Sequence, residues 1–512
     1  MSCNFRINSP APNTNNSNIG GVSMIHITRG LIPFWDDYLI DHRFTDAVLS
    51  VNKPEKKDVV LVFDKPWEGH GTGYITMIKE ADKYRMYYEV WAPFDPDYSD
   101  GINVCYAESN DGIHWEKPNL GICEFRGSTD NNIILRRIED NFTVMRDDNP
   151  DCPPEHRYKA TLYSADPNDT LTDLAKVVGS ETKNSLICMV SHDGIHFKKH
   201  SVISRGYAYD TLNSLHWNPH KKKYYCYIRD FHVNPVNPLS NKNEKEVRGI
   251  RVMESDDFEN WTEPQPLNFT GGVDYPLYTN CIMAYPGDTR YYVGWPSRYV
   301  ERKEWTANYD RLCGAEKRKE RMARHPRMGL TVTDCVFMSS RDNVNWYRFD
   351  EACITPGPEM GTNWIYGDCY PALGGLVETP SAFPGEPNEL SVYVDFDRWH
   401  QLPVKMARYV YRMDGFASVK STYRPQTLRT KPFIFEGGTL KLNFRTSARG
   451  GIVLKILDEK NIPVDGYTTC EIFGDSVDRI VDFDKPLADL QGKVISFEFT
   501  MSDAELYAMR LQ

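Results

Sequence analysis

SNDGIHW at residues 109–115 and SHDGIHF at residues 191–197 are near-identical heptads in this chain of 512 residues. Two further copies keep the same Ser-x-Asp-x-x-x-aromatic pattern: SDDFENW at 255–261 and SRDNVNW at 340–346. A degenerate fifth copy, RMDGFAS at 412–418, retains the Asp-Gly pair but lacks the serine and the terminal ring. The recurrence identifies a repeated structural unit, and five copies predict five such units.

The segments around the heptads have the composition of β-strands, with many β-branched and aromatic residues. Examples are KYRMYYEVW (83–91), RYKATLYS (157–164), KYYCYIRDF (223–231) and RYYVGWP (290–296). Inside each heptad, Asp-Gly or Asp-Asn marks a tight turn, because Asp bonds neighbouring amides and Gly accepts positive φ. Each unit is therefore predicted to be a group of antiparallel strands with a signature turn.

The copies begin at residues 109, 191, 255, 340 and 412, and this spacing exceeds the roughly 40–45 residues of a compact propeller blade. The excess predicts long loops of the kind that build sites. We expect an all-β protein: an extended or disordered segment over 1–30, a five-bladed β-propeller over 31–423, and a C-terminal β-sandwich over 424–512. The alternative is a pair of β-sandwiches whose turns resemble one another by chance. The expected sandwich carries no acid cluster, so we expect it to stabilise the propeller.

Composition excludes several classes of function. The net charge is −11, and the only basic run, EKRKERMARHPR at 316–327, alternates in sign, so no nucleic-acid partner is expected. Residues 1–23 lack the apolar run of a signal peptide, and no stretch is long and apolar enough to predict membrane insertion. The 12 cysteines are scattered without a CxxC pair, which favours reduced thiols in a cytoplasmic protein and no metal site.

Candidate site residues are expected just before the inner strand of each blade, where propeller residues converge at one mouth of the central channel. An acid occurs in each repeat: Glu68, Asp147, Asp210, Asp274 and Asp368. The first three are predicted to be catalytic, and the last two to bind substrate. Further predicted substrate-binding residues lie beside them or in nearby loops: Trp67, Arg146, Tyr209, Asn213, Tyr278, Arg298 and Trp364. Any one of these acids could instead cap a turn, but five together indicate acid–base chemistry.

Carboxylates accompanied by many rings are typical of carbohydrate chemistry. A glycosidase requires a protonated acid for the leaving oxygen and an ionised carboxylate that activates water or attacks the sugar. Additional sugar-contacting candidates are Tyr366, Trp91, Trp295, Trp399, Arg229 and Arg408. The chain contains no GxSxG, Walker, HExxH or GxGxxG signature, so no cofactor is expected.

Several longer motifs resemble those of bacterial proteins related to the invertase and arabinanase group, the family 32/43-like glycoside hydrolases. They include FWDDYLID (34–41), PWEG (66–69), YAESNDGIHWEKPNLG (106–121), RDDNPDCPPEHRYKA (146–160) and YRMDGFAS (411–418). The resemblance implies a five-bladed propeller and three catalytic acids, which fall on Glu68, Asp147 and Asp210. The Arg-Asp stabiliser motif continues here with Asp148 in place of proline, and the NDPNG and EC motifs are absent.

The sequence therefore favours a glycoside hydrolase acting on a small oligosaccharide or glycoside. Two alternatives stay open: a glycoside phosphorylase, which would need a basic cluster beside the acids, and a non-catalytic carbohydrate-binding propeller. The expected partner is a carbohydrate substrate, with no membrane association, and the sequence leaves a homo-oligomer open.

Overall fold

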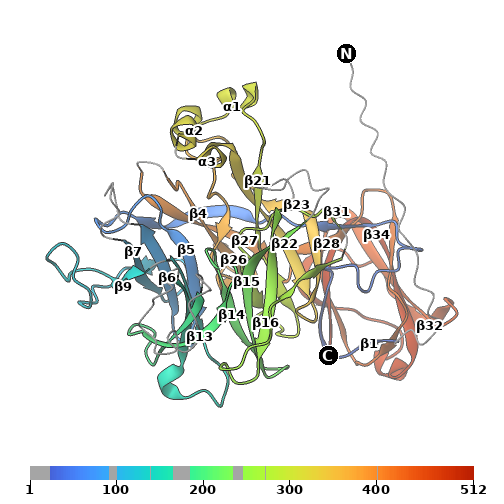
Figure 1. Cartoon of the computed structure of the whole chain (residues 1–512). Helices are drawn as coiled ribbons and strands as arrows, with labels where there is room; N and C mark the ends of the chain where they lie inside the picture. The colour runs from blue at the N-terminus through green and yellow to red at the C-terminus, as the bar shows by residue number, and fades with distance from the viewer. Residues whose placement is uncertain are drawn as a thin grey trace.

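The computed structural model describes residues 24–91, 101–138, 140–164, 185–233, 246–270, 272–323, 325–399 and 402–512. Five sheets, antiparallel apart from one short parallel pair at the edge of one blade, form a five-bladed propeller, with a second β domain beside it (Figure 1). The predicted fold class is confirmed. The expected structure of the first 23 residues lies outside the described residues.

Blades one to three follow one another along the chain, each from the inner strand outward. Blade one holds β5 (Gly73–Lys79), β6 (Tyr84–Trp91), β7 (Ile102–Ser109) and β8 (Trp115–Glu116), with β9 (Ile133–Ile138) added to β7. Blade two holds β10 (Asp140–Arg146), β11 (Tyr158–Ser164), β12 (Ser185–Ser191) and β13 (Lys198–Arg205), with the short η1 (Pro154–His156) between β10 and β11. Blade three holds β14 (Ser214–Asn218), β15 (Lys223–Val233), β16 (Glu246–Ser255) and β17 (Gln265–Pro266).

The last two blades are less regular. Blade four contains β19 (Ile282–Ala284), β20 (Tyr292–Gly294), β21 (Ser297–Glu301), β22 (Thr331–Ser340) and β23 (Asn345–Ile354), edged by β18 (Asn268–Phe269). Blade five contains β24 (Tyr370–Pro371), β25 (Val377–Thr379), β26 (Glu389–Phe396) and β27 (Val404–Arg412). Its outer strand is β4 (Glu55–Phe63), which comes from the start of the propeller sequence and closes the ring against β27.

The heptads occupy the same turn in successive blades, between the third and fourth strands. In the first copy the Ser109 hydroxyl accepts the Gly112 N–H at 2.9 Å, and the Asp111 carboxylate accepts the amides of Ile113 and His114 at 2.8 Å. The fourth heptad position has positive φ in every full copy: Gly112 76°, Gly194 75°, Phe258 69° and Asn343 75°. The terminal aromatic residues are therefore structurally equivalent.

The second domain is built from both ends of the described chain. Its strands are β1 (Ile25–Ile27), β2 (Gly30–Pro33), β3 (Val48–Val51), β28 (Ala417–Lys420), β29 (Gln426–Arg429), β30 (Phe433–Phe435), β31 (Leu440–Leu457), β32 (Pro463–Thr468), β33 (Asp475–Ile480) and β34 (Val494–Leu511), with the short η3 (Leu487–Leu490) before β34. Because β2 pairs with β34 and β3 pairs with β28, the expected propeller boundary at residue 31 moves to β4. Short strands do not reveal their distant partners in the sequence.

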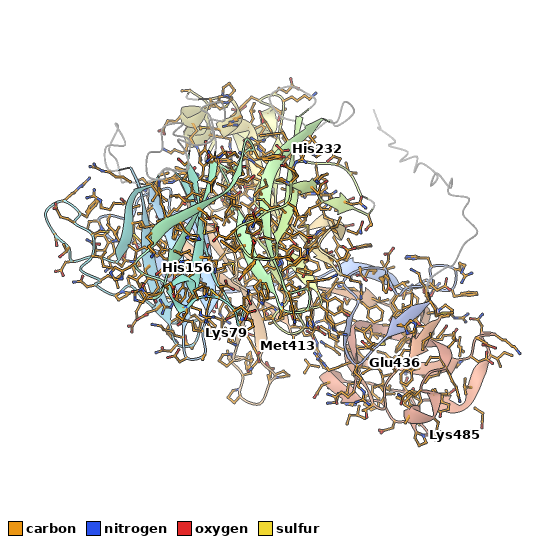
Figure 2. The ribbon with its side chains drawn as sticks, turned by 60° about the horizontal axis from the view of Figure 1, so that its bottom comes forward. Lys79, His156, His232, Met413, Glu436 and Lys485 are labelled. Atoms are coloured by element: carbon orange, nitrogen blue, oxygen red, sulfur yellow. The ribbon has the colours of Figure 1, made fainter. Side chains whose placement is uncertain are left out.

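The two ends of the propeller can be located by a few labelled residues. Lys79 and Met413 lie together at one end, and His232 lies away from them at the other, while Glu436 and Lys485 mark the second domain (Figure 2). Three short helices follow β21 and stand above the His232 end: α1 (Ala307–Arg311), α2 (Ala315–Met322) and α3 (Arg327–Leu330). We call residues 307–330 the helical insertion.

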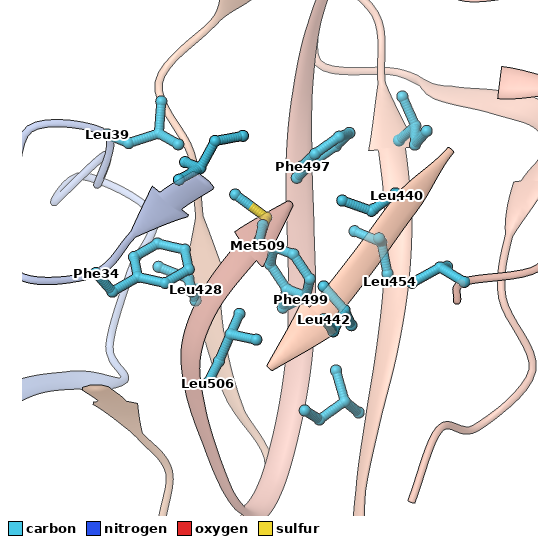
Figure 3. Packing of buried hydrophobic residues seen from close by; sticks show 14 of the residues in the cluster. Phe34, Leu39, Leu428, Leu440, Leu442, Leu454, Phe497, Phe499, Leu506 and Met509 are labelled. Carbon is cyan, nitrogen blue, oxygen red and sulfur yellow. The ribbon is translucent and has the colours of Figure 1, made fainter. Parts of the chain in front are cut away.

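The second domain has its own apolar core. Leu440, Leu454, Phe497 and Phe499 are fully buried there, and side chains from facing strands interdigitate between them (Figure 3). The Trp35 side chain extends from this domain and packs between the aromatic rings of Tyr285 and Phe416 in the propeller, with 4.9 and 5.0 Å between ring centroids. The domains therefore share buried surface.

No disulfide joins the cysteines that the structure describes. Among the described residues, no helix is long and apolar enough to cross a membrane.

Candidate active site

Two cavities open at opposite ends of the central channel. One has a volume of about 350 Å³ and is lined mainly by apolar residues at the carboxyl ends of the inner strands, among them Met145, Trp217 and Met283. The other has a volume of about 230 Å³ and is lined by rings and charged groups. We call this second cavity the mouth cavity; its lining residues are Tyr163, Ala208, Tyr209, Asp210, Arg229, Phe231, Arg248, Tyr278, Tyr299, Arg327 and Tyr366.

A pair of carboxyl groups lies beside the channel on the same side as the mouth cavity. Glu89 is fully buried on β6, opposite Gly73 at the amino end of β5, and Asp140 is the first residue of β10. The two side chains are hydrogen-bonded to each other, and Glu89 also accepts the Phe142 N–H. Two acids from neighbouring blades therefore meet where the inner strands begin.

Burial decides the protonation of this pair. Desolvation raises the pKa of Asp140 from 3.8 to about 6, and it raises the pKa of Glu89 well above its ordinary value, with the Asp140 charge as the next cause. Like charges this close cannot both ionise without a large penalty, so the pair titrates as a unit. At neutral pH it retains a proton that can be donated.

Arg398 is a buried arginine whose charge acts on the Glu89–Asp140 pair. It is 1% exposed, donates to the Gly71 carbonyl at 3.1 Å, and lies 5.6 Å from the Trp91 ring and 5.4 Å from the Trp399 ring. Its positive charge partly offsets the rise in pKa that burial causes in both members of the Glu89–Asp140 pair. Asp395 lies 3.4 Å from its Nε, and desolvation raises the pKa of that carboxyl to about 7.

Asp210 lies in the mouth cavity, where it forms an ion pair with Arg229. The Asp210 side chain is 55% exposed, whereas the Arg229 side chain is 5% exposed. Arg229 also donates to the Ala208 carbonyl at 3.2 Å and lies 5.4 Å from the Tyr278 ring centroid. Because the Arg229 charge also acts on Asp140, one guanidinium links the carboxyl pair to the exposed carboxylate electrostatically.

Phenol groups connect the cavity to the channel. The Tyr278 hydroxyl lies 3.0 Å from that of Tyr74 and 3.1 Å from that of Tyr366. Burial raises the pKa of Tyr74 and of Tyr366, so both stay protonated and act as hydrogen-bond donors. Such donors beside flat rings suit the hydroxyls and C–H faces of a sugar.

The helical insertion covers this end of the channel. Arg318 of α2 is 1% exposed and donates to the Trp364 and Cys313 carbonyls, which fixes the helix to the loop before β24. Arg321, one turn later, lies 5.6 Å from the Tyr366 ring and 5.3 Å from the Trp399 ring. The insertion therefore adds guanidinium groups to the site from above.

Glu68 does not reach the mouth cavity, contrary to the expected convergence. Its carboxylate accepts the Tyr88 hydroxyl at 2.6 Å and the Lys117 amine at 2.7 Å. Tyr88 and Glu89 are adjacent on β6, so their side chains point to opposite faces of the blade. Glu68 therefore faces the apolar contact between blades one and five, where it satisfies buried donors.

Asp147 lies at the opposite end of the channel, because it follows β10 instead of preceding it. It is fully buried, and its carboxylate accepts from Lys159, from the Tyr224 hydroxyl at 2.8 Å and from the Asn149 N–H at 2.9 Å. The expectation that it precedes an inner strand is therefore wrong. Seven residues of extended strand, about 23 Å, separate it from Asp140.

The other predicted residues divide between the two ends and the blade interiors. Tyr209 and Tyr278 line the mouth cavity with Asp210, and Asp274 lies 2.9 Å from His232 beside it. The remaining predicted residues do not line it. Arg146 lines the apolar cavity, and Arg298 forms an ion pair with Asp334. Trp67, Asn213 and Trp364 donate hydrogen bonds to Asn132, to the Tyr209 carbonyl and to the Gly357 carbonyl, respectively, and the buried Asp368 accepts the Ile365 N–H.

The sequence did not predict five residues at this end of the channel: Glu89, Asp140, Arg248, Arg321 and Arg398. Glu89 offered a signal, because it is the one acid in the strand-like run YYEVW. Asp140 offered a weaker one, since Asp-Asn precedes the apolar segment FTVM and Asn141 takes a φ of 61°. Within the described residues, no group of three His, Cys, Asp or Glu side chains is placed to hold a metal ion.

No protein-family model and no curated protein sequence matches the chain. Among solved structures, an N-acetylgalactosamine deacetylase from F. plautii in complex with blood group B trisaccharide has a TM-score of 0.43 and 12% identity, over 71% of this chain and 96% of that one. A Penicillium chrysogenum α-L-arabinanase has a TM-score of 0.36 and 11% identity, over 70% and 98%. The Bombyx mori β-fructofuranosidase has a TM-score of 0.36 and 11% identity, over 92% and 95%. The last two belong to the invertase and arabinanase group that the sequence motifs resemble.

Proposed function

We propose that the protein is a glycoside hydrolase whose acid–base groups are Glu89, Asp140 and Asp210. The observation that carries the proposal is the buried, proton-retaining Glu89–Asp140 pair, which Arg229 links to an exposed carboxylate in a cavity lined by tyrosines. Carboxyl groups whose surroundings push their protonation states apart are what acid–base catalysis requires.

The chemistry follows from the protonation states. The Glu89–Asp140 pair holds the proton that the leaving glycosidic oxygen needs as its bond to the anomeric carbon breaks. Asp210 supplies the carboxylate that activates water or attacks the anomeric carbon. The tyrosine hydroxyls donate hydrogen bonds to sugar hydroxyls, and ring faces cover the sugar C–H surface.

The surroundings of Glu68 and Asp147 favour a structural role over the predicted catalytic role. Each is held by a lysine and a tyrosine in a buried network. Removing one partner of a buried ion pair typically destabilises a protein by about 3–5 kcal/mol. Asp147→Asn is therefore expected to lower the melting temperature, while the kcat of the folded variant stays within a few-fold of the wild-type value.

The test starts with hydrolysis of a panel of aryl glycosides and oligosaccharides of both anomeric configurations. On a substrate that is turned over, we expect Glu89→Gln, Asp140→Asn and Asp210→Asn each to lower kcat by on the order of 10²–10⁴-fold. Circular dichroism spectra of the three variants should match that of the wild type. Melting temperatures should be unchanged or higher for Glu89→Gln and Asp140→Asn, whereas Asp210→Asn should melt at a lower temperature because it removes the ion-pair partner of the buried Arg229.

Asp148→Asn is the matched control. Asp148 lines the opposite cavity, and its side chain is 66% exposed, 3.5 Å from Arg146. This variant should keep wild-type turnover. If the variants at Glu89, Asp140 and Asp210 also stay within a few-fold of the wild type, the catalytic acids lie elsewhere.

A further inference from the structure

The second domain has a surface hollow that the proposed reaction does not use. It lies where the chain passes from β32 to β33, apart from the helical insertion (Figure 1), and all of its lining residues come from the segment 469–482. Its volume of about 480 Å³ is within the roughly 300–1,000 Å³ typical of pockets for small molecules. We call it the second-domain hollow.

Two large apolar side chains are exposed at this hollow. Phe473 is 62% exposed and Ile480 is 52% exposed, although the rings of Phe497 and Phe499 in the same domain are fully buried. An apolar ring that stays in water beside a recess does not contribute to the core of its own domain. It is available to a ligand that brings a flat apolar face.

Three charged side chains in the hollow have no ionic or hydrogen-bonding partner. In the part of the chain that the structure describes, no hydrogen bond or ion pair engages the side chains of Glu471, Arg479 or Asp482. Elsewhere in the same domain such groups do pair, as Arg445 does with Glu505 at 2.7 Å. Unpaired groups of both signs leave donors and acceptors of hydrogen bonds for a ligand.

Glycines bring two of these charged groups against the floor of the hollow. A Cβ on Gly451 would lie 2.5 Å from Oε1 of Glu471, so the Glu471 side chain lies directly over backbone that has no side chain. Gly474 has a φ of 115°, which favours glycine, and a Cβ there would lie 3.7 Å from Nη2 of Arg479. Arg479 also lies 5.8 Å from the Phe444 ring centroid. The carboxylate and the guanidinium therefore have defined positions in the hollow.

We propose that the second-domain hollow binds a neutral carbohydrate chain, separately from the mouth cavity. A sugar hydroxyl both donates and accepts, so one sugar unit can donate to the carboxylates of Glu471 and Asp482 and accept from the guanidinium of Arg479. The C–H face of the sugar can stack on the ring of Phe473. An anionic sugar fits less well, because the lining residues carry two carboxylates against one guanidinium.

A second copy of this chain is the other candidate occupant. Among the described strands β33 pairs only with β31, so one of its edges is open. This edge is poorly suited to pairing with another strand, because its register with β31 shifts between Leu442 and Phe444 and because Asp475 and Asp478 lie along it. The observations therefore favour a small ligand.

The first experiment is native affinity electrophoresis of the full-length protein in gels that contain arabinan, galactan, xylan or levan, with polygalacturonate as the charged comparison. Calorimetric titration with the corresponding soluble trisaccharides then measures affinity. We expect at least one neutral polysaccharide to retard the protein, and its trisaccharide to bind about 10-fold or more tightly than trigalacturonate. Light scattering measures the oligomeric state at the same protein concentrations.

Three variants tie binding to the hollow. Phe473→Ala should lower the affinity by about 10- to 100-fold, because the sugar loses the apolar surface of the ring. Arg479→Gln should lower it by about 10-fold, because a charged hydrogen-bond donor is removed. Phe383→Ala is the matched control, since Phe383 is 64% exposed but lies on the propeller, outside the hollow. Melting curves check that each variant is folded.

Each outcome decides for or against the proposal. Retardation that Phe473→Ala and Arg479→Gln abolish and Phe383→Ala keeps supports it. Retardation that Phe473→Ala leaves unchanged, or no retardation by any neutral polysaccharide, overturns it. Equal or tighter binding of trigalacturonate overturns the assignment to a neutral sugar. A dimer that Phe473→Ala dissociates, without retardation, overturns the proposal in favour of a contact between copies.

These measurements are independent of the proposed hydrolysis. They use binding, oligomeric state and folding, and none of them requires turnover at the mouth cavity. Loss of the second-domain hollow as a sugar site would therefore leave the hydrolase proposal intact, and an inactive protein would still be able to bind a carbohydrate there.

Discussion

Asp140 shows how burial of a carboxyl group lowers the stability of the folded protein at neutral pH. It lies in a dry site beside a second carboxyl, so its ionised form is disfavoured and its pKa rises from 3.8 to about 6. The folded protein therefore binds more protons than the unfolded chain between these two pH values. Below pH 3.8 Asp140 is largely protonated in the folded and unfolded states, so it does not change the free energy of unfolding. Above about pH 6 its ionisation lowers the free energy of unfolding by the full amount.

We predict that Asp140→Asn stabilises the protein by an amount that grows as the pH rises from 4 to 7. The gain should approach about 3 kcal/mol at most, because the shift is close to two pKa units of roughly 1.4 kcal/mol each. Denaturant unfolding of wild type and variant at pH 4, 5, 6 and 7 measures it. Asp148→Asn, which removes an exposed charge, should show no such trend. A constant difference across this range would mean that Asp140 is not desolvated as described.

Glu68 and Asp147 are buried acids that, unlike Asp140, are paired with lysine side chains. Both carboxylates are buried, but lysine amines and phenols satisfy them, so their charge is part of the folded structure. A sequence shows only that an acid precedes or follows an apolar run. It does not show whether that acid will meet a lysine or another acid.

The heptad turn is the element that repeats most faithfully. In the third copy, Asp257 accepts the amides of Glu259 and Asn260 at 2.8 Å and the Ser255 hydroxyl at 3.1 Å. Backbone and side-chain hydrogen bonds from Asn260 lower the pKa of Asp257 well below 3.8. The same carboxylate–amide pattern recurs at Asp111, Asp193 and Asp342.

We predict that Asp257→Ala destabilises the protein by about 1 kcal/mol at pH 7, a value kept small because the turn is solvent-exposed. Asp256→Ala in the same turn is the control, since its side chain is 80% exposed and lies 3.5 Å from Lys223. Because the folded-state pKa of Asp257 is depressed, its contribution is complete above pH 3.8 and is lost as the pH falls toward the folded pKa. Chemical unfolding of both variants at pH 7 and pH 3.5 checks this. Equal effects of the two substitutions would show that the turn hydrogen bonds contribute little.

At the scale of the whole molecule, the two domains depend on each other. Strands β2 and β3 from the amino-terminal side lie in the second domain, while Trp35 inserts into the propeller core beside Tyr285 and Phe416. The Trp35 indole also donates to the Asp414 carbonyl at 2.9 Å, in the fifth copy of the heptad. The second domain thus covers the turn of the blade that closes the ring.

We predict that a chain ending at Tyr423 aggregates or binds hydrophobic dyes, because β2 loses β34 and apolar surface of the propeller becomes exposed. The control is the full chain with a protease site inserted at the exposed segment 422–425 and cut after folding, which should stay soluble with both parts associated. Solubility, dye binding and melting curves compare the two. A soluble shortened chain that melts cooperatively at the wild-type temperature would contradict this prediction.

The sequence alone determined the number of blades and their signature turns. That information is local: a turn needs Asp, Ser and a residue that accepts positive φ within seven positions, and strand composition needs only near neighbours. The same local character explains why the sequence identified one mouth acid, Asp210, from its place before a predicted inner strand.

The tertiary structure alone decided which side chains come together at this end of the channel. Glu89 comes from a second strand, Asp140 from the start of an inner strand, and Arg321 from an inserted helix, so no spacing in the sequence links them. Their meeting depends on the direction of each inner strand and on the face toward which each side chain points, and a shift of one residue reverses that face. The propeller could therefore be predicted from its repeats, whereas the candidate site required the arrangement of the blades around the channel.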